Sequence, residues 1–168
     1  KYKLPVFYVN QVGAQTDLIF DGGSMILDRD ANIIHESPYF RENIFYYETE
    51  NSKNNQQFSN STKSERIHDA LVIGIKDYFA KLGFKKALIG LSGGIDSAVV
   101  CSLAKEALGK DNVHGVLMPS EFSSAHSVDD AVALANNLKI THEILPIAKA
   151  YCAFTDILSS TFSGLPFG

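Results

Sequence analysis

Short apolar, β-branched and aromatic runs recur over the first forty positions of the chain. These runs predict strands over residues 4–10, 18–20, 24–28 and 33–36. Gly13 is expected to break the first strand, and Asp21-Gly22-Gly23 is a strong turn signal. No helical spacing lies between the runs, so the pattern predicts a β meander. A meander of this size buries little core without a further layer against it.

The apolar spacing changes to a helical period after residue 61. Thr62 and Glu65 have the spacing of a capping box, and Gly83 has the position of a C-terminal cap. Apolar residues recur between them at helical intervals, namely Ile67, Leu71, Ile75, Tyr78 and Leu82. The sequence therefore predicts one helix over residues 62–82.

Strand and helix patterns alternate through the remainder of the chain. They predict strands over 88–91, 113–118 and 143–147, and helices over 96–108, 127–138 and 148–158, with Ser127 as the cap of the middle helix. This alternation is typical of an α/β fold with a parallel, doubly wound, Rossmann-like sheet and right-handed crossovers. The loops at Ser92, Pro119 and Ile147 should share the carboxyl edge of that sheet, where ligands bind.

The composition divides the chain into three segments. Residues 41–61 include an Asn-, Ser- and Gln-rich tract that buries too little to repay its ordering entropy, so we interpret them as a linker. Residues 1–40 and 62–168 are then parts of two domains. The 168 residues suit one average domain or pieces of two. Because the chain begins without Met and stops soon after a predicted helix, we expect it to be a piece of a longer protein.

Charge, cysteine content and hydropathy exclude several classes of function. A net charge of −4 gives no support to nucleic-acid binding, and no apolar run is long enough for a membrane span. Cys101 and Cys152 lack metal-type spacing, so we expect two ordinary buried thiols and a reducing, cytoplasmic location. Turn chemistry explains the aspartates of the first segment better than a metal site does.

The stretch that organises the second segment is Ser92-Gly93-Gly94-Ile95-Asp96-Ser97. It follows an apolar strand and opens a helix, where unpaired N–H groups favour an anion. The absence of a lysine excludes a Walker A loop, and Gly90, Gly93 and Gly94 do not have dinucleotide-fold spacing. Two hydroxyls and several N–H groups can cradle a pyrophosphate, while Asp96 can hold Mg²⁺. This combination favours adenylyl transfer with release of pyrophosphate.

These residues resemble the SGGxDS loop of the ATP-pyrophosphatase (PP-loop) superfamily, which has an adenine nucleotide alpha hydrolase-like fold. Together with Val116–Ser120, Ser123-Ser124 and Asp130-Ala131, the segment Gly90–Ala98 resembles the glutamine-dependent NAD⁺ synthetase family. Val9–Gly13 and Phe20–Ser24 are similar to the closing strands of its nitrilase-like glutaminase domain. The resemblance covers the chain except for the linker.

The resemblance implies amidation of deamido-NAD⁺ (nicotinic acid adenine dinucleotide) to NAD⁺ through an adenylated intermediate. It implies ATP and Mg²⁺ as cofactors, glutamine or ammonia as the nitrogen source, and a homo-oligomeric enzyme. Its ATP-binding residues would be Gly90, Leu91, Ser92, Gly93, Gly94, Ile95, Asp96, Ser97, Leu117 and Met118, with Asp96 on Mg²⁺. The glutaminase Glu, Lys and Cys of that family precede this segment, and neither cysteine replaces the nucleophile, so the chain by itself should be catalytically incomplete.

The loop leaves two other readings open. One is another PP-loop ATP pyrophosphatase, either GMP-synthetase-like or tRNA-thiolating, although the acidic balance and the lack of a CxxC disfavour the tRNA enzyme. The other is a non-catalytic ATP-binding module. Both predict nucleotide at Ser92–Ser97, and they differ in what happens to the pyrophosphate.

Overall fold

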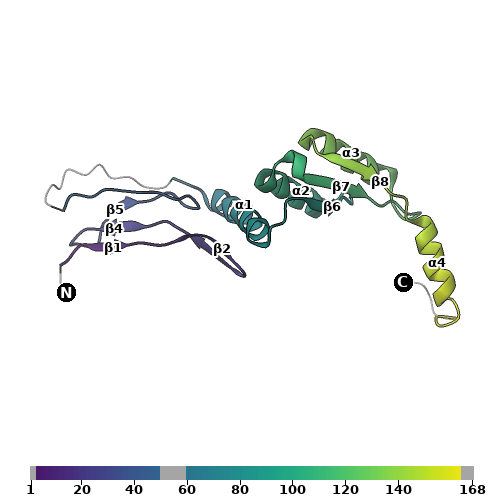
Figure 1. The fold of residues 1–168 in the computed structure, drawn as a ribbon, viewed down its shortest axis with the longest axis horizontal. Helices are drawn as coiled ribbons and strands as arrows, with labels where there is room; N and C mark the ends of the chain where they lie inside the picture. The colour runs from purple at the N-terminus through teal and green to yellow at the C-terminus, as the bar shows by residue number, and fades with distance from the viewer. Residues whose placement is uncertain (1–2, 50–59, 164–168) are drawn as a thin grey trace. The chain divides into compact units, whose positions relative to one another are not determined.

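A computed structural model of the protein describes residues 3–49 and 60–163. The middle of the expected linker, residues 50–59, lies outside the described residues. The chain divides into two compact units, Lys1–Phe84 and Lys85–Gly168, and most of their elements are labelled in Figure 1. Helix α1 (Lys63–Leu82) falls in the first unit. The boundaries proposed above, with residues 62–168 as one domain, remain a prediction.

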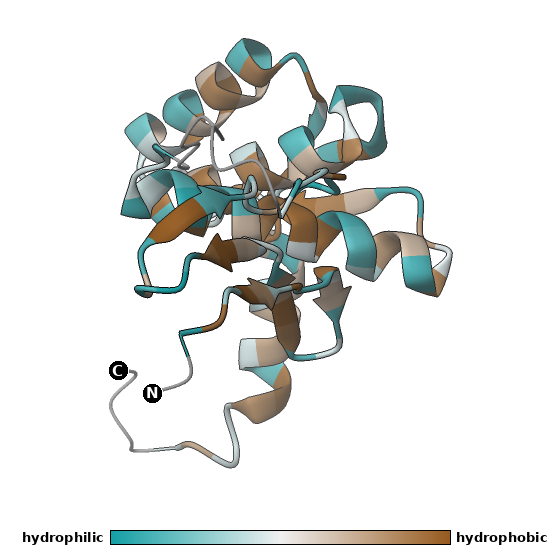
Figure 2. Cartoon of the chain, turned by 90° about the vertical axis from the view of Figure 1, so that its left-hand side faces the viewer, coloured by the Kyte–Doolittle hydropathy of each residue, from teal (hydrophilic) through white to brown (hydrophobic). Residues whose placement is uncertain are grey.

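The first unit contains short antiparallel strands. They are β1 (Val6–Tyr8), β2 (Val12–Gln15), β3 (Leu18–Asp21), β4 (Met25–Leu27) and β5 (Ile33–Glu36). The expected antiparallel pairing is present, with no crossover helix between these strands. The order is not that of a simple meander, however, because β1 pairs with β4 and β4 with β5, while β2 and β3 form a separate hairpin. Figure 2 colours the chain by hydropathy, and brown, apolar stretches lie on the strand arrows.

Two backbone breaks explain this strand order. The side chain of Ser24 accepts a hydrogen bond from the Asn10 N–H at 3.0 Å, and the Gly22 N–H donates to the Gln11 carbonyl. The ladder is therefore interrupted between β1–β4 and β2–β3, and the two pairs continue one another as a broken hairpin. Gly13 does not break the strand as expected, because it lies within β2 with a φ of 128°.

Helix α1 has the caps that the sequence predicts. Thr62 accepts a hydrogen bond from the Glu65 N–H, and the Glu65 carboxylate accepts one from the Thr62 N–H at 2.6 Å. These bonds from Thr62 lower the pKa of Glu65, because they stabilise the carboxylate. At the other end Gly83 adopts the left-handed conformation, with a φ of 73°.

The second unit is a parallel α/β layer in which the strands lie in the order β6-β7-β8. The strands are β6 (Ala87–Gly90), β7 (Val113–Leu117) and β8 (Thr141–Ile144), and the helices are α2 (Ile95–Leu108), η1 (Lys110–Asn112), α3 (Ala125–Leu138) and α4 (Ala148–Leu158). Helices α2 and α3 pack on the sheet and enclose one apolar core. Its buried members are Leu91, Cys101, Ala104, Val113, Leu117, Ala131, Ala135 and Ile140. The Rossmann-like α/β expectation is confirmed.

Two expected details of this unit are wrong. Helix α3 starts at Ala125 because Ser124, and not Ser127, supplies the capping oxygen to the Ser127 N–H. Strand β8 spans Thr141–Ile144 instead of residues 143–147. Beyond its end, the Leu145 N–H donates to the Leu117 carbonyl at 2.8 Å and the Ile147 N–H to the Pro119 carbonyl at 3.0 Å, but residues 145–147 are not part of the strand.

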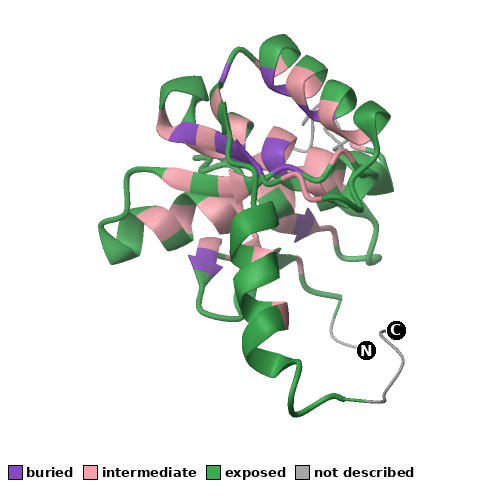
Figure 3. Cartoon of the chain, turned by 90° about the vertical axis from the view of Figure 1, so that its right-hand side faces the viewer, coloured by how far each residue is buried: buried purple, intermediate pink, exposed green. Residues whose placement is uncertain are grey.

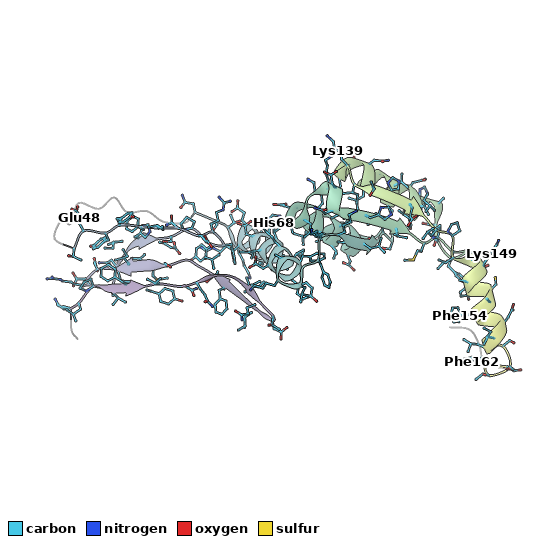
Figure 4. All side chains as sticks on the ribbon, viewed as in Figure 1. Glu48, His68, Lys139, Lys149, Phe154 and Phe162 are labelled. Atoms are coloured by element: carbon cyan, nitrogen blue, oxygen red, sulfur yellow. The ribbon has the colours of Figure 1, made fainter. Side chains whose placement is uncertain are left out.

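Helix α4 carries no buried residue and is almost wholly exposed, as its green colour in Figure 3 shows. Phe154 on this helix and Phe162 beyond it, both labelled in Figure 4, are 67% and 45% exposed. In the described part of the chain, no helix combines the length and the apolar character that crossing a membrane requires.

Candidate functional site: a serine–glycine loop at the start of α2

The loop between β6 and α2 is held by its two serine side chains. The Ser92 and Ser97 hydroxyls lie 3.1 Å apart in a hydrogen bond, and the Ser97 hydroxyl also donates to the Gly94 carbonyl at 3.0 Å. The Ser97 oxygen accepts from the Ser92 N–H at 3.3 Å, and Ser92 accepts from the Gly94 N–H at 3.2 Å. These bonds bring the first and last residues of the predicted loop together and curl its backbone around them.

Gly93 is the residue that allows the loop to lie against α3. Its φ is 78°, and a Cβ added there would lie 2.2 Å from the Ser127 carbonyl oxygen and 2.7 Å from the Ser127 Cα. A backbone atom cannot move out of the way as a side-chain end can, so only glycine fits. The loop is therefore built against the first turn of a helix that follows it by thirty residues.

Gly94 is the N-cap of α2 and offers no capping side chain. The N–H groups of the first turn, which begins at Ile95, thus lack that partner at the positive end of the helix dipole. Ile95 and Asp96 are both exposed there. This is the geometry that suits an anion.

The neighbouring strand ends meet the loop as the parallel topology predicts. The Leu91 N–H donates to the Val116 carbonyl at 2.8 Å, and the Ile147 N–H donates to the Pro119 carbonyl at 3.0 Å. Ser92, Pro119 and Ile147 therefore share one edge of the sheet, which confirms that expectation. Beyond β7, the Ser123 hydroxyl accepts from the Ser120 N–H at 3.0 Å.

Two hollows flank the loop within this unit. One, of about 360 Å³, is lined by Leu91, Gly93, Gly94, Ile95, Ser97, Ala98, Asp130, Ala131 and Leu134. The other, of about 140 Å³, is lined by Leu91, Ser92, Leu117, Met118, Pro119, Ser123, Ser127 and Val128. Residues of the loop therefore line both hollows.

The remaining predicted residues have different roles in the structure. Gly90 ends β6, with the Met118 side chain over it, and Leu91 is buried in the core. Leu117 is 1% exposed and its carbonyl is occupied by the Leu145 N–H, so its side chain is a core residue. Met118 is 51% exposed and lines the smaller hollow beside Ser92.

Asp96 is the predicted magnesium ligand. It is an exposed carboxylate in the first turn of α2. Among residues 3–49 and 60–163, no group of three or more His, Cys, Asp or Glu side chains has the geometry of a metal site. A single carboxylate suits Mg²⁺, which keeps most of its waters and takes further ligands from bound phosphates.

The two cysteines differ from each other. Cys101 is buried in the core, where desolvation raises the pKa of its thiol, as an inert structural cysteine requires. Cys152 is exposed on α4, so the expectation of a second buried thiol is wrong. In the first unit, Asp28 accepts from the N–H groups of Asp30 and Asn32, which is turn chemistry.

Sequence reasoning assigned no site role to Ser127 or Asp130. The Ser127 backbone lies against Gly93, and Asp130 lines the larger hollow together with Ser97. The signal that could have identified them is the Ser123-Ser124 pair before Asp130-Ala131, because this pair indicates that a capped helix begins at the same edge of the sheet.

Comparison with known proteins supports this geometry. A sequence model of the NAD synthase family matches residues 67–165. The chain is 44% identical to the glutamine-dependent NAD(+) synthetase of Synechocystis sp., with 100% of this chain and 31% of the relative covered. It therefore spans about a third of that relative's length.

Two solved structures extend the comparison. The glutamine-dependent NAD⁺ synthetase of Acinetobacter baumannii, in complex with ADP, has a TM-score of 0.92 and 33% identity, covering 99% of this chain and 32% of that one. The NH3-dependent NAD synthetase of Campylobacter jejuni has a TM-score of 0.54 and 32% identity, covering 58% of this chain and 42% of that one. The family match, the strand–loop–helix geometry and these relatives agree, and the chain belongs to the NAD synthase family.

Proposed function

We propose that this chain carries the ATP-binding loop of a glutamine-dependent NAD⁺ synthetase, an enzyme that amidates deamido-NAD⁺. The observation that carries the proposal is the Ser92–Ser97 loop, with Gly93 fitted against Ser127 at the start of α2. Family membership supports it, and so does the ADP complex of the Acinetobacter baumannii relative.

The loop suits the pyrophosphate that leaves during adenylation. An oxygen of the substrate carboxylate attacks the α-phosphorus of ATP, and the bond to pyrophosphate breaks. Ammonia then attacks the acyl carbon, AMP leaves, and the nitrogen loses a proton to give the amide. Adenylation is needed because a carboxylate has no good leaving group of its own. Hydroxyls of Ser92 and Ser97, with the N–H groups that open α2, would hold the leaving pyrophosphate.

Asp96 would hold Mg²⁺ beside that pyrophosphate, and the ion would neutralise charge on the leaving group. Asp96 lies in the first turn of α2, next to the N–H groups that would bind the phosphate, and its carboxylate does not occupy them as a cap. Met118 would pack on adenine from the smaller hollow, which the largely buried Leu117 also lines.

Glutamine as the nitrogen source is favoured by the first unit. The glutamine-dependent relative of known structure covers 99% of this chain, and the NH3-dependent relative covers 58%. The smaller share is close to the part that the NAD synthase family match occupies. We infer that the residues before that match accompany glutamine use, which agrees with the nitrilase-like resemblance of the first forty residues.

The test is NAD⁺ formation by a full-length protein that contains this chain, supplied with deamido-NAD⁺, MgATP and ammonium chloride. We expect Asp96→Ala to reduce the rate about a hundredfold, because it removes a ligand of the metal on the leaving group. Asp111→Ala is the matched control, since Asp111 is an 86% exposed carboxylate beyond the other end of α2.

Release of pyrophosphate must depend on deamido-NAD⁺. Release without it would favour another PP-loop ATP pyrophosphatase. Binding of ATP with no pyrophosphate release under any of these conditions would favour a non-catalytic module. Equal rates for Asp96→Ala and Asp111→Ala would contradict the magnesium role.

A further inference from the structure

One residue of the β2–β3 hairpin has both backbone groups bound by side chains of α1. Ala14 pairs with Ile19 across the hairpin, and its N–H donates to the Asp77 Oδ2 at 2.8 Å. The Lys81 Nζ donates to the Ala14 carbonyl oxygen. Ala14 is 6% exposed, so these groups are removed from solvent. Two side chains one helical turn apart thus supply what a neighbouring strand would supply. We call Asp77, Lys81 and Ala14 the hairpin latch.

Glycines on both partners allow this close approach. A Cβ on Gly13, whose φ is 128°, would lie 3.0 Å from the Asp77 Oδ2. A Cβ on Gly74 would lie 3.2 Å from the Ile19 Cδ1. The helix therefore comes close enough for the latch only because neither surface carries a side chain at these points.

The hairpin latch restricts the position of α1 on the hairpin more tightly than apolar packing alone does. Hydrogen bonds in which the donor or the acceptor is charged are directional and stronger than neutral ones. One bond to the N–H and one to the carbonyl of the same residue define both the rotation of α1 and its position along its axis. Apolar contacts such as Ile19 on Gly74 tolerate sliding that would break either polar bond.

The latch joins a segment that lies before the NAD synthase family match to a helix that lies largely within it. The NAD synthase family match begins at residue 67, inside α1, whereas the hairpin precedes it. Helix α1 ends at Leu82, Gly83 caps it, and β6 starts at Ala87 and runs into the ATP loop. The helix bound by the hairpin is thus connected through four residues to the strand that carries the site.

We infer that Asp77 and Lys81 are positioning residues for glutamine-driven NAD⁺ formation. They hold the helix that leads into the ATP loop in register with the segment that accompanies glutamine use. This inference rests on the proposed function. Both side chains belong to the first unit and the ATP loop belongs to the second, so we expect free ammonia to be used equally well with or without the latch.

The experiment measures NAD⁺ formation by the full-length protein with glutamine and, separately, with ammonium chloride. Asp77→Ala and Lys81→Met should each lower the glutamine-driven kcat/KM about tenfold and leave the ammonia-driven value within about twofold. Asp77→Asn keeps an oxygen that accepts from the Ala14 N–H, so it should retain most of the glutamine-driven rate. Lys76→Met, at an exposed position of α1, is the matched control and should change neither rate.

Each outcome of this experiment supports or overturns the positioning role of Asp77 and Lys81. Equal losses with both nitrogen sources show a merely structural role and overturn the inference, as does the absence of any change. If Asp77→Ala does not fold, as judged by circular dichroism, Lys81→Met still tests the selective loss of the glutamine-driven rate, and Asp77→Asn remains the variant that should retain that rate. Failure of the unmodified protein to use ammonia at all overturns the proposed function instead, so the two failures remain separate.

Discussion

The two units of this chain differ in how they hold their strands. In the second unit, α2 and α3 cover the parallel sheet, and residues such as Leu117 and Val113 are 1% exposed. In the described part of the first unit, the buried apolar residues are Ala14 and Ile26, whereas Val6 on β1 is 52% exposed. A parallel sheet under helices makes its own core, whereas short antiparallel strands rely on turns, caps and the hairpin latch. The site loop belongs to the unit that has its own core.

The substitution with the largest expected effect tests whether the second unit positions the Ser92–Ser97 loop. Gly93→Ala places a methyl group against the Ser127 backbone at a positive φ. It should lower the free energy of unfolding by about 2–4 kcal/mol and MgATP affinity at least a hundredfold, as measured by thermal unfolding and calorimetry. Gly109→Ala is the matched control, since Gly109 has a φ of 86° but nothing within 4 Å of an added Cβ. It should cost about 1 kcal/mol and leave binding intact. Equal losses of stability and of MgATP affinity in the two variants would show that the positive φ alone, and not the contact with Ser127, causes the effect.

A pair of strand substitutions tests the contrast in cores directly. Leu117→Ala should lower the free energy of unfolding of the second unit by about 3 kcal/mol, because it leaves a cavity in a close-packed core. Val6→Ala should cost the first unit less than about 1 kcal/mol, because Val6 is half exposed. Amide hydrogen exchange resolves the two units separately. A similar cost for both substitutions would mean that β1 is covered in solution.

A smaller effect is expected from a hydroxyl that shapes the loop but not the core. Ser97→Ala removes the bonds to Ser92 and the Gly94 carbonyl, and should weaken MgATP binding about tenfold. The free energy of unfolding should change by less than about 0.5 kcal/mol, since the site is open to solvent. Ser102→Ala, which loses a bond to the Ala98 carbonyl on the same helix, should not change calorimetric affinity. A loss of affinity in Ser102→Ala would point to α2 as a whole.

The smallest effect concerns the first unit and pH. His35 is buried, its ring stacks on Phe45 and its Nε2 bonds with the Ser37 hydroxyl at 3.2 Å. Desolvation lowers the pKa of His35 from its usual 6.5. The unfolded chain therefore takes up a proton first as the pH falls, so this contribution to stability is present above pH 6.5 and declines as the pH falls through the folded-state pKa. Hydrogen exchange between pH 7.5 and about 5 should show the decline in β5. It should be absent in His35→Gln, and an unchanged decline in that variant would assign it to another group.

Much of the second unit, and helix α1 of the first, could be predicted because their signals are local. The apolar runs, the capping box at Thr62 and the Gly83 cap are set by residues within a turn or two of one another. Parallel topology then brings strand ends to one edge, so Ser92, Pro119 and Ile147 were predicted to meet. The cap of α3 was misplaced from Ser124 to Ser127, because both serines suit an N-cap and only the backbone path distinguishes them.

The first unit was less predictable because its pairing is irregular. Adjacent antiparallel runs predict neighbouring strands, yet β1 pairs with β4 across a break at Asn10 and Ser24. The local sequence predicts that Gly13 breaks a strand. In the structure Gly13 lies in β2, where the approach of Asp77 requires a residue without a side chain. Such choices depend on partners distant in sequence, which no local pattern records.

The sequence by itself determined most of the elements, although not strand β2, together with the serine–glycine loop between β6 and α2 and the family resemblance that the NAD synthase match bears out. Local propensity and spacing are sufficient for these. Only the tertiary structure decided that Gly93 lies on Ser127, that Leu117 is a core residue while Met118 borders the loop, and that Asp77 and Lys81 bind Ala14. Each of these is a contact between distant residues, fixed by steric fit and hydrogen-bond satisfaction when the chain has closed.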